Sequence, residues 1–395
     1  MKPKIVSLFS GAGGMDLGFK QAGFEVLLAN DFEKDACNTY KKNIDNNILE
    51  GDVKNLKEND VPKNIDVLIG GFPCQGFSIA NKNRNENDER NSLYKEMIRI
   101  IKASNPKIIV AENVKGILSL GKGEIFKQIQ VDLKELGYDV SFSLFNTAYF
   151  GVPQFRERVI IIANKIGVAN MFPEKTYGNN EKPFIPVKSV ISHLAEIPIS
   201  YNSFELNGKE IHNHIASTNV HDKFWGRKHE VSQFDICDYL KEWRKKAGIS
   251  TKKIDEIFGY KHTAGHWFRK DNNSGSIPQP SDWFRLKEIL KFDDAYDLQV
   301  TELIEKQIVF EQSLRITNWE TPSDTITATS PEIHVNKERR LSARECAIIQ
   351  TFPDDFIFTG SLNSMYKQIG NAVPVKFAKA VATNILQMLY EHKRI

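Results

Sequence analysis

Residues 5–14 read IVSLFSGAGG, an apolar run that passes directly into a glycine-rich turn. The apolar part, residues 5–9, predicts a buried β-strand. The glycines allow a tight turn in which backbone N–H groups approach a ligand closely. The spacing differs from the Gly-x-Gly-x-x-Gly fingerprint of dinucleotide-binding folds, which argues against a nicotinamide cofactor.

Four further apolar runs predict strands of the same sheet, at Val26–Ala29, Val67–Ile69, Ile108–Ala111 and Val159–Ala163. Helical patterns lie between most of them, for example at residues 93–101 and 125–136. Strands that alternate with helices predict an α/β fold with a doubly wound, mostly parallel sheet. Such sheets bind ligands beyond the carboxyl ends of their strands, so residues that follow the strands are the first candidates for a site.

The middle of the chain departs from this alternation. From about residue 180 to 320 prolines, asparagines and histidines increase, and an α/β texture resumes near Arg339. The chain then ends in a helical pattern whose apolar stripe includes Phe377 and Leu389. We therefore expect a first domain over 1–180, a smaller inserted domain over 181–320, and a return to the first domain over 321–395.

Composition limits the class of protein. The chain has 395 residues and a net charge of only +3, so a nucleic-acid surface would need local clustering of charge. The four cysteines contain no Cys-x-x-Cys pair, which argues against a disulfide scaffold or a zinc knuckle and favours a reducing compartment. No apolar run approaches membrane-spanning length, so we expect a cytoplasmic protein. We also expect no bound metal, because the cysteines do not form a zinc-binding pattern.

Acidic residues follow the second and third strands. Asp31, with Phe32 beside it, comes after the run at 26–29, and Asp52 follows a short strand that ends near residue 50. A carboxylate can accept hydrogen bonds from ribose hydroxyls or an adenine amino group, and an aromatic ring can pack on adenine. Together these residues indicate an adenosine-containing cofactor that makes no demand for phosphate binding.

Groups suited to covalent chemistry follow the next strands. Cys74 lies in Gly-Phe-Pro-Cys-Gln directly after the run at 67–69, and Glu112 ends the run at 108–111. A thiolate is the nucleophilic form of cysteine and suits an open cleft, whereas Cys37, Cys237 and Cys346 are expected to be small buried hydrophobic residues. Arg156 and Arg158 are two residues apart, so an extended chain points both to one face, which could bind an anion or simply be solvated.

Taken in order, these blocks resemble the C5-cytosine-specific DNA methyltransferase family, of the bacterial modification type. The blocks are Phe-Ser-Gly-Ala-Gly-Gly, Asn-Asp, Gly-Asp, Pro-Cys-Gln, Glu-Asn-Val, Gln-x-Arg-x-Arg, and the C-terminal stretches 340–347 and 368–374. They extend over residues 4–165 and 320–390. The resemblance implies the fold of S-adenosylmethionine-dependent methyltransferases, with S-adenosylmethionine as the cofactor.

The resemblance also assigns roles. Cys74 would attack C6 of a cytosine flipped out of duplex DNA, Glu112 would act on the N3 proton, and Arg158 with Arg156 would orient the base and the carboxylate. Many members carry glutamate where Asp31 stands, so this shorter acid has less reach toward ribose. The residues expected to bind the cofactor are Phe9, Gly11, Gly13, Leu17, Asp31, Phe32, Asp52, Leu93 and Asn371.

The inserted domain occupies the place where the family keeps its target-recognition domain. Within it, residues 241–270 carry nine basic residues against three acidic ones, with aromatic residues interleaved. The segment 237–270 resembles a helix-turn-helix, with 263–269 as a third helix, while Trp243 and Phe258 are expected in its core. A polar loop over residues 75–90 is expected to close over the DNA, or else to be plain surface. The DNA-contact candidates are Gln75, Ser78, Arg90, Lys252, Lys261, His262 and Arg269.

Two other interpretations stay open at this point. An RNA cytosine methyltransferase would share the catalytic set, although the tRNA-modifying members have short recognition regions. A non-catalytic DNA-binding regulator would use the helix-turn-helix on an inert scaffold, which the joint presence of Cys74, Glu112, Arg156 and Arg158 argues against. The preferred interpretation adds double-stranded DNA and a companion restriction endonuclease as partners, and a monomeric state.

Overall fold

A computed structural model of the chain describes residues 2–72, 92–218, 233–259, 280–305, 316–329, 331–336 and 338–394. The chain forms two compact units. Unit 1 consists of Met1–Ile215, Asn318–Pro331 and Ser342–Ile395, and unit 2 consists of Ala216–Thr317 and Glu332–Leu341.

Unit 1 contains a seven-stranded sheet in the order β3-β2-β1-β4-β5-β7-β6. The five strands from β3 to β5 are parallel, and β7 is antiparallel to both β5 and β6. The predicted α/β class with a mostly parallel sheet is therefore confirmed. The strands are β1 Lys4–Leu8, β2 Glu25–Asp31, β3 Ile48–Glu50, β4 Val67–Gly70, β5 Ile108–Val114, β6 Asp139–Asn146 and β7 Glu157–Asn164.

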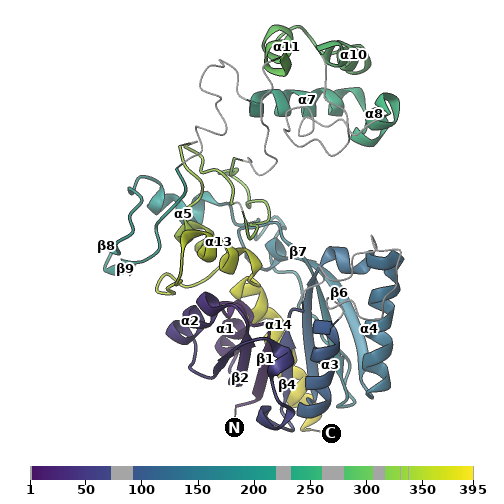
Figure 1. Cartoon of the computed structure of the whole chain (residues 1–395), viewed down its shortest axis with the longest axis vertical. Helices are drawn as coiled ribbons and strands as arrows, with labels where there is room; N and C mark the ends of the chain where they lie inside the picture. The colour runs from purple at the N-terminus through teal and green to yellow at the C-terminus, as the bar shows by residue number, and fades with distance from the viewer. Residues whose placement is uncertain are drawn as a thin grey trace. The chain divides into compact units, whose positions relative to one another are not determined.

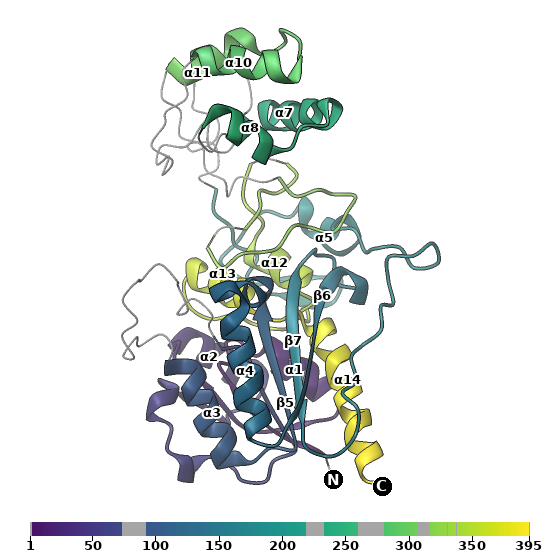
Figure 2. The same ribbon diagram turned by 90° about the vertical axis from the view of Figure 1, so that its right-hand side faces the viewer.

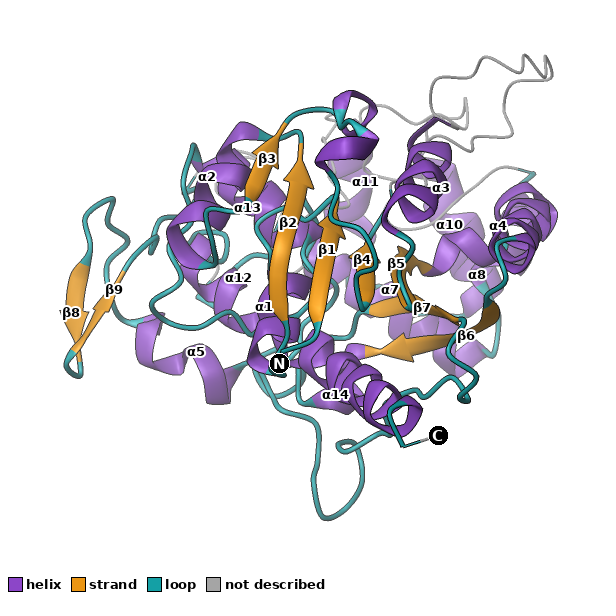
Figure 3. Ribbon diagram, turned by 90° about the horizontal axis from the view of Figure 1, so that it is seen from below, coloured by secondary structure: helices purple, strands orange, loops and turns teal. Residues whose placement is uncertain are grey.

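Helices cover both faces of this sheet. Figures 2 and 3 show α3 and α4 on one face and α1 and α14 on the other. Alternate residues of the strands, such as Val6, Leu8 and Leu68, pack with α3 and α4 in one buried core. The helices of unit 1 are α1 Gly14–Gln21, α2 Lys34–Asn43, α3 Ser92–Ser104, α4 Glu124–Glu135, α5 Lys188–Ala195, α12 Ala343–Ile349, α13 Leu362–Asn371 and α14 Val375–His392. Short 3₁₀ helices lie at Val53–Asn55, Glu58–Asp60, Lys115–Leu118, Leu120–Gly123 and Thr147–Phe150, and a small hairpin joins β8 Phe204–Leu206 to β9 Lys209–Ile211.

The C-terminal helix α14 returns to the first strands, as its apolar stripe predicts. Phe377, Val381 and Ile385 are all buried. The helix lies so close to α1 that a Cβ added at Gly18 would stand 2.5 Å from the Cβ of Ala378. Burial of the stripe against α1 therefore joins the two ends of the chain in one core.

Unit 2 contains helices α7 Gln233–Ala247, α8 Thr251–Phe258, α10 Pro280–Leu290 and α11 Asp297–Glu305 (Figure 1). They enclose a separate hydrophobic core around the fully buried Trp283, to which α7 contributes Leu240 and α8 contributes Ile254 and Phe258. Because these helices form a core of their own, the alternation of strands and helices in the sequence stops in this region.

The limits of the inserted unit differ from the expected 181–320. Residues 181–215 belong to unit 1, because Val187 N and Lys188 N at the start of α5 each donate at 3.0 Å to the carbonyls of Thr321 and Trp319. Residues 332–341 belong to unit 2, where Thr317 N donates to Ile333 O at 2.8 Å. These backbone hydrogen bonds join segments far apart in sequence, so composition alone does not reveal the boundary.

Candidate active site

The described residues that follow β1, β2, β4 and β5 lie at the carboxyl edge of the parallel strands. The strand order reverses direction between β1 and β4, because β2 follows β1 on one side while β4 lies on the other. A crevice at this switch point is where open α/β sheets bind ligands. The glycine-rich turn follows β1, and the chain toward Cys74 follows β4, so the two halves of the expected site lie at one edge.

The cofactor end of the site is organised by Asp31. Its Oδ2 accepts a hydrogen bond from Gly11 N at 2.8 Å, and its Oδ1 accepts one from Glu33 N at 2.9 Å. Burial raises the pKa of this carboxyl group, and the two backbone donors oppose that effect. Each carboxylate oxygen retains acceptor capacity, so ribose hydroxyls can add to the bonds that already fix the side chain.

The glycine-rich turn departs from ordinary backbone geometry. Gly11 and Gly13 have φ of 54° and 86°, and Phe9 has φ of 55°, which is unusual for a bulky residue. A non-glycine residue held in this region costs about 1–3 kcal/mol, and such strain gathers at ligand sites. An added Cβ at Gly14 would stand 2.5 Å from Val373 O, so the C-terminal block 368–374 packs directly against the turn.

The other cofactor candidates differ in exposure. Phe32 presents 65% of its surface to solvent beside Asp31, and the Nζ of Lys367 lies 6.0 Å from the centre of its ring. An exposed aromatic ring next to the carboxylate of Asp31 is free to stack on a planar ligand. Asp52 is exposed and accepts from Lys54 N at 2.9 Å, Leu17 and Leu93 are partly buried, and Asn371 is exposed.

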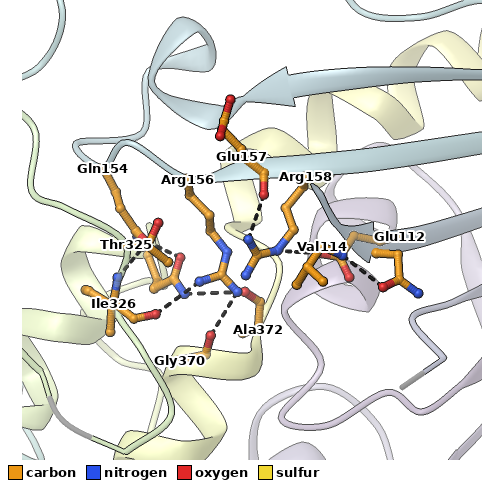
Figure 4. Close-up of polar contacts among 12 residues, drawn as sticks. Glu112, Val114, Gln154, Arg156, Glu157, Arg158, Thr325, Ile326, Gly370 and Ala372 are labelled. Carbon is orange, nitrogen blue, oxygen red and sulfur yellow. Dashed lines mark hydrogen bonds and ion pairs between the residues drawn. The ribbon is translucent and has the colours of Figure 1, made fainter. Parts of the chain in front are cut away.

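The chemical end of the site is an ion pair between neighbouring strands. Arg158 Nε on β7 lies 2.8 Å from Glu112 Oε1 on β5, with only 12% and 11% of the two side chains exposed (Figure 4). The N–H of Arg158 is not directed well enough at this oxygen to make a hydrogen bond, so the contact is mainly electrostatic. Antiparallel pairing of β5 with β7 brings the two residues together.

The chain that leaves β4 lies directly against Glu112. An added Cβ at Gly71 would stand 3.1 Å from Glu112 Oε2, so glycine gives the carboxylate its space. Asn113 Nδ2 donates to Phe72 O at 2.9 Å and ties the two strand ends together. The carboxylate of Glu112 therefore lies against the segment that leads into Cys74.

Arg156 and Arg158 extend to the same side of β7, as their spacing predicts, yet they bind different partners (Figure 4). Arg156 is 1% exposed and donates to Ile326 O at 3.1 Å and to Gly370 O at 2.8 Å. Burial, with the nearby charge of Arg158, lowers its pKa to about 9. Arg156 thus joins the loop that contains Ile326 to the C-terminal end of α13, whereas Arg158 contacts Glu112.

An open hollow of about 400 Å³ lies beside this ion pair. Arg158, Asn146, Thr325 and Val114 line it, and the pair formed by Lys115 and Glu157 at 3.0 Å borders it. A planar base that entered the hollow would meet the guanidinium that contacts Glu112. The hollow therefore lies next to the guanidinium of Arg158, which contacts Glu112.

Several expected residues lie outside the part of the chain that the structure describes. They are Cys74, Gln75, Ser78 and Arg90 after β4, Lys261, His262 and Arg269 after α8, and the side chain of Cys237. Of the described cysteines, Cys37 and Cys346 are fully buried, as expected. The pKa of Cys37 is raised to about 12, mainly by burial, which keeps this thiol unreactive.

One buried polar pair behind the glycine-rich turn was not predicted from the sequence. Tyr40 OH donates to Asp16 Oδ1 at 2.9 Å, and Asp16 is completely buried. The side chains of Ile44 and Tyr40 fill the space that a Cβ at Gly13 would occupy. An acid in the first turn of a helix is normally a surface residue that favours the helix dipole, so the sequence contained no sign of its burial.

Two helices, α7 and α8, with a short turn between them occupy the described part of the segment that was expected to resemble a helix-turn-helix. Gly248 has φ of 65° in the turn, Ser250 caps α8 by accepting from Lys253 N at 3.2 Å, and Gly259 ends the helix in the left-handed region. Phe258 is buried and Trp243 partly buried in the core, as expected, and Lys252 is exposed. The third helix expected at 263–269 falls outside the described residues.

Comparisons with known proteins agree on one family. The model of the C-5 cytosine-specific DNA methylase family matches residues 3–387. The type II methyltransferase M.NgoFVII of Neisseria gonorrhoeae is 34% identical over 99% of this chain and 88% of its own length. The type II methyltransferase M1.HphI of Haemophilus parahaemolyticus is 32% identical over 98% of this chain and 88% of its own length.

Solved structures share the fold. A crystal structure described as a prophage-encoded DNA modification methyltransferase of E. coli superimposes with a TM-score of 0.60 at 21% identity and covers 98% of this chain and 100% of that one. The crystal structure of the S. pombe Dnmt2 methyltransferase gives a TM-score of 0.54 at 16% identity and covers 98% of this chain and 99% of that one. Among the described residues, no helix is long and apolar enough to cross a membrane.

Proposed function

The chain belongs to the C-5 cytosine-specific DNA methylase family and is a DNA cytosine-C5 methyltransferase that uses S-adenosylmethionine. On this premise we propose that Cys74 is the nucleophile, that Glu112 and Arg158 act on the base, and that unit 2 selects the DNA sequence. The observation that carries the assignment is the buried pair between Glu112 and Arg158, which lies against the chain leading to Cys74.

Covalent geometry supports the choice of Cys74. Gly71 lies against the Glu112 carboxylate, and Cys74 follows it by three residues. Three residues reach at most about 11 Å, so the chain that leaves Gly71 allows Cys74 to act on a base beside Glu112. Cys37 and Cys346 are completely buried and cannot meet a base.

The chemistry follows from these groups. The thiolate of Cys74 bonds to C6 of the flipped cytosine, and electron density moves through the ring toward C5 and N3. Glu112 holds a proton at N3, and the positive charge of Arg158 fixes the Glu112 carboxyl group and stabilises the charge that enters the ring. When bound, S-adenosylmethionine supplies the methyl group that C5 accepts. Loss of the C5 proton to a base then expels the Cys74 thiolate and restores the ring.

The residues at the other end of the edge fit the cofactor. Gly11 and Gly13 hold a turn in the left-handed region, and an added Cβ at Gly11 would meet nothing within 4 Å, which leaves space for a ligand. We assign ribose to Asp31 and adenine to the exposed ring of Phe32. We assign Arg156 a positioning role, because it is buried and its guanidinium donates to the carbonyls of Ile326 and Gly370.

Two further parts of the proposal concern the cellular setting. The relatives named above are type II methyltransferases of bacteria. We therefore propose that this enzyme protects the target site of a companion restriction endonuclease, and that it acts as a monomer on double-stranded DNA in the cytoplasm.

A substitution at the nucleophile tests the mechanism. Cys74→Ser is expected to abolish transfer of label from tritiated S-adenosylmethionine to duplex DNA while cofactor binding persists, since hydroxyl is a far weaker nucleophile than thiolate. Cys237→Ser is the matched control and should keep transferring label. A duplex with 5-fluorocytosine at the target should form a stable adduct at Cys74, because fluorine replaces the departing proton. Near-normal turnover by Cys74→Ser, or label in tRNA alone, would refute the proposal.

A further inference from the structure

Helix α8 of unit 2 presents one charged face to solvent. Lys252, Lys253, Glu256 and Ile257 are exposed, and their spacing places them on one side of the helix. Ile254 and Phe258 occupy the opposite side and are buried in the core. Ile257 presents 40% of its surface to solvent among these charges. The face therefore offers donors, an acceptor and an apolar group over two turns.

The charges on this face oppose the stability of the helix. Lys252 and Lys253 lie in the first turn of α8, where the structure has no acidic residue. A positive charge at that end meets the positive pole of the helix dipole and costs about 0.3–1 kcal/mol. In α7, by contrast, Lys245 and Lys246 lie in the last turn, where the dipole favours them. Asp255 and Glu256 follow these lysines, so the positive charge of α8 lies at its N-terminal end, where an anion from a partner would offset the cost.

Contacts within α8 do not remove this cost. Lys253 Nζ lies 3.7 Å from Glu256 Oε2, with 65% and 54% of the side chains exposed. An ion pair with such exposure contributes little, so both side chains remain available to a partner.

The rest of unit 2 fixes α8 from behind. Arg285 on α10 donates from Nη2 to Ile257 O at 2.9 Å, and its guanidinium lies 4.7 Å from the centre of the Phe258 ring. These contacts hold the C-terminal end of α8, while the side chain of Ser250 caps its first turn. A helix held at both ends presents its exposed face in one orientation, which the recognition of base edges requires.

The geometry points to α8 as the recognition helix that enters the major groove of the duplex target. This inference rests on the proposed function, because it takes unit 2 as the part that selects the sequence. Lys252 neutralises a backbone phosphate, Lys253 donates to a guanine edge, and Glu256 accepts from the amino group of cytosine or adenine. The second helix of a helix-turn-helix docks in this way, with its N-terminal residues at the bases.

The test uses the full-length enzyme and a duplex library randomised around the methylated cytosine, read by bisulfite sequencing. Glu256→Gln and Lys253→Ala are each expected to relax one base position, with discrimination there falling by about 5- to 150-fold. Lys252→Ala should weaken binding to all duplexes alike and reduce the slope of log affinity against log salt by about 0.9. Glu242→Gln and Lys245→Ala on α7, which are also exposed, are matched controls and should leave the preferred site unchanged.

The outcomes separate this inference from its premise. If the wild-type enzyme methylates a defined duplex site, and the α8 variants keep the same site preference and salt dependence, the role of α8 is refuted while the methyltransferase assignment stands. If the wild-type enzyme methylates no duplex, the proposed function fails and this inference fails with it. Thermal melting of each variant checks that it is folded. We expect melting temperatures near that of the wild type, because the substituted side chains are exposed and outside the core.

Discussion

Removing Arg158 tests the central pair of the active site. In Arg158→Met the Glu112 carboxylate stays buried without its cation, and 2.8 Å between charges corresponds to about 6 kcal/mol at an effective dielectric constant of 20. Desolvation offsets much of this attraction, and measured losses for breaking a buried pair are about 3–5 kcal/mol. Because slightly more than a tenth of each side chain is exposed, we expect a loss of about 3 kcal/mol in the free energy of unfolding.

The neighbouring pair provides the control. Lys115 and Glu157 lie 3.0 Å apart on the same edge, but 59% and 47% of their side chains are exposed. An exposed pair contributes only about 0–1 kcal/mol, so Lys115→Met should change unfolding little. If Arg158→Met and Lys115→Met lowered the free energy of unfolding in urea by equal amounts, burial would not govern the strength of these ion pairs.

A double-mutant cycle separates charge from packing. Glu112→Gln should restore part of the stability lost in Arg158→Met, because the stranded carboxylate is gone. Methyl transfer should stay low in the double variant and should fall at least about a hundredfold in Arg158→Met, as for other groups that stabilise developing charge. If Glu112→Gln restores no stability to Arg158→Met, the electrostatic argument is wrong.

Two further variants test groups behind and beside the site. Burial raises the pKa of Asp16 from 3.8 to about 6, so folding favours the protonated form; its contribution to stability is complete below about pH 4 and is lost as pH rises through 6. Asp16→Asn should therefore stabilise the enzyme at pH 8 by up to about 3 kcal/mol. The melting temperature of this variant should depend less on pH between pH 4 and 6 than that of the wild type. An unchanged pH profile would contradict burial of the charge. Gly71→Ala places a methyl group 3.1 Å from Glu112 Oε2, so the carboxylate must shift. The turnover number should fall roughly tenfold while the melting temperature and cofactor affinity change little, and unaltered turnover would mean that the position of Glu112 is not critical.

Local sequence patterns were sufficient for the parallel strands, the glycine-rich turn, and the helices α7 and α8 with the turn between them. The strands β1, β4 and β5 are continuous apolar runs because they are buried on both faces, and Ser250 and Gly259 mark the ends of α8 through their own backbone chemistry. The order of the family's motifs also indicated the reaction, since the chemistry requires certain residue types at the strand ends. The strand β6 was missed because this edge strand is mostly exposed or partly buried and its sequence mixes Ser with Phe.

The partners of each side chain depend on contacts that no local pattern encodes. Strand pairing brings Arg158 to Glu112, while Arg156, two residues away, is buried against Ile326 and Gly370. Asp16 looked like an ordinary acid at a helix start, but α2 covers it and supplies the hydroxyl of Tyr40. The limits of unit 2 likewise follow from hydrogen bonds between distant segments. Residue types thus specify which chemistry is available, whereas register and packing determine which charge is buried, paired or open to a substrate.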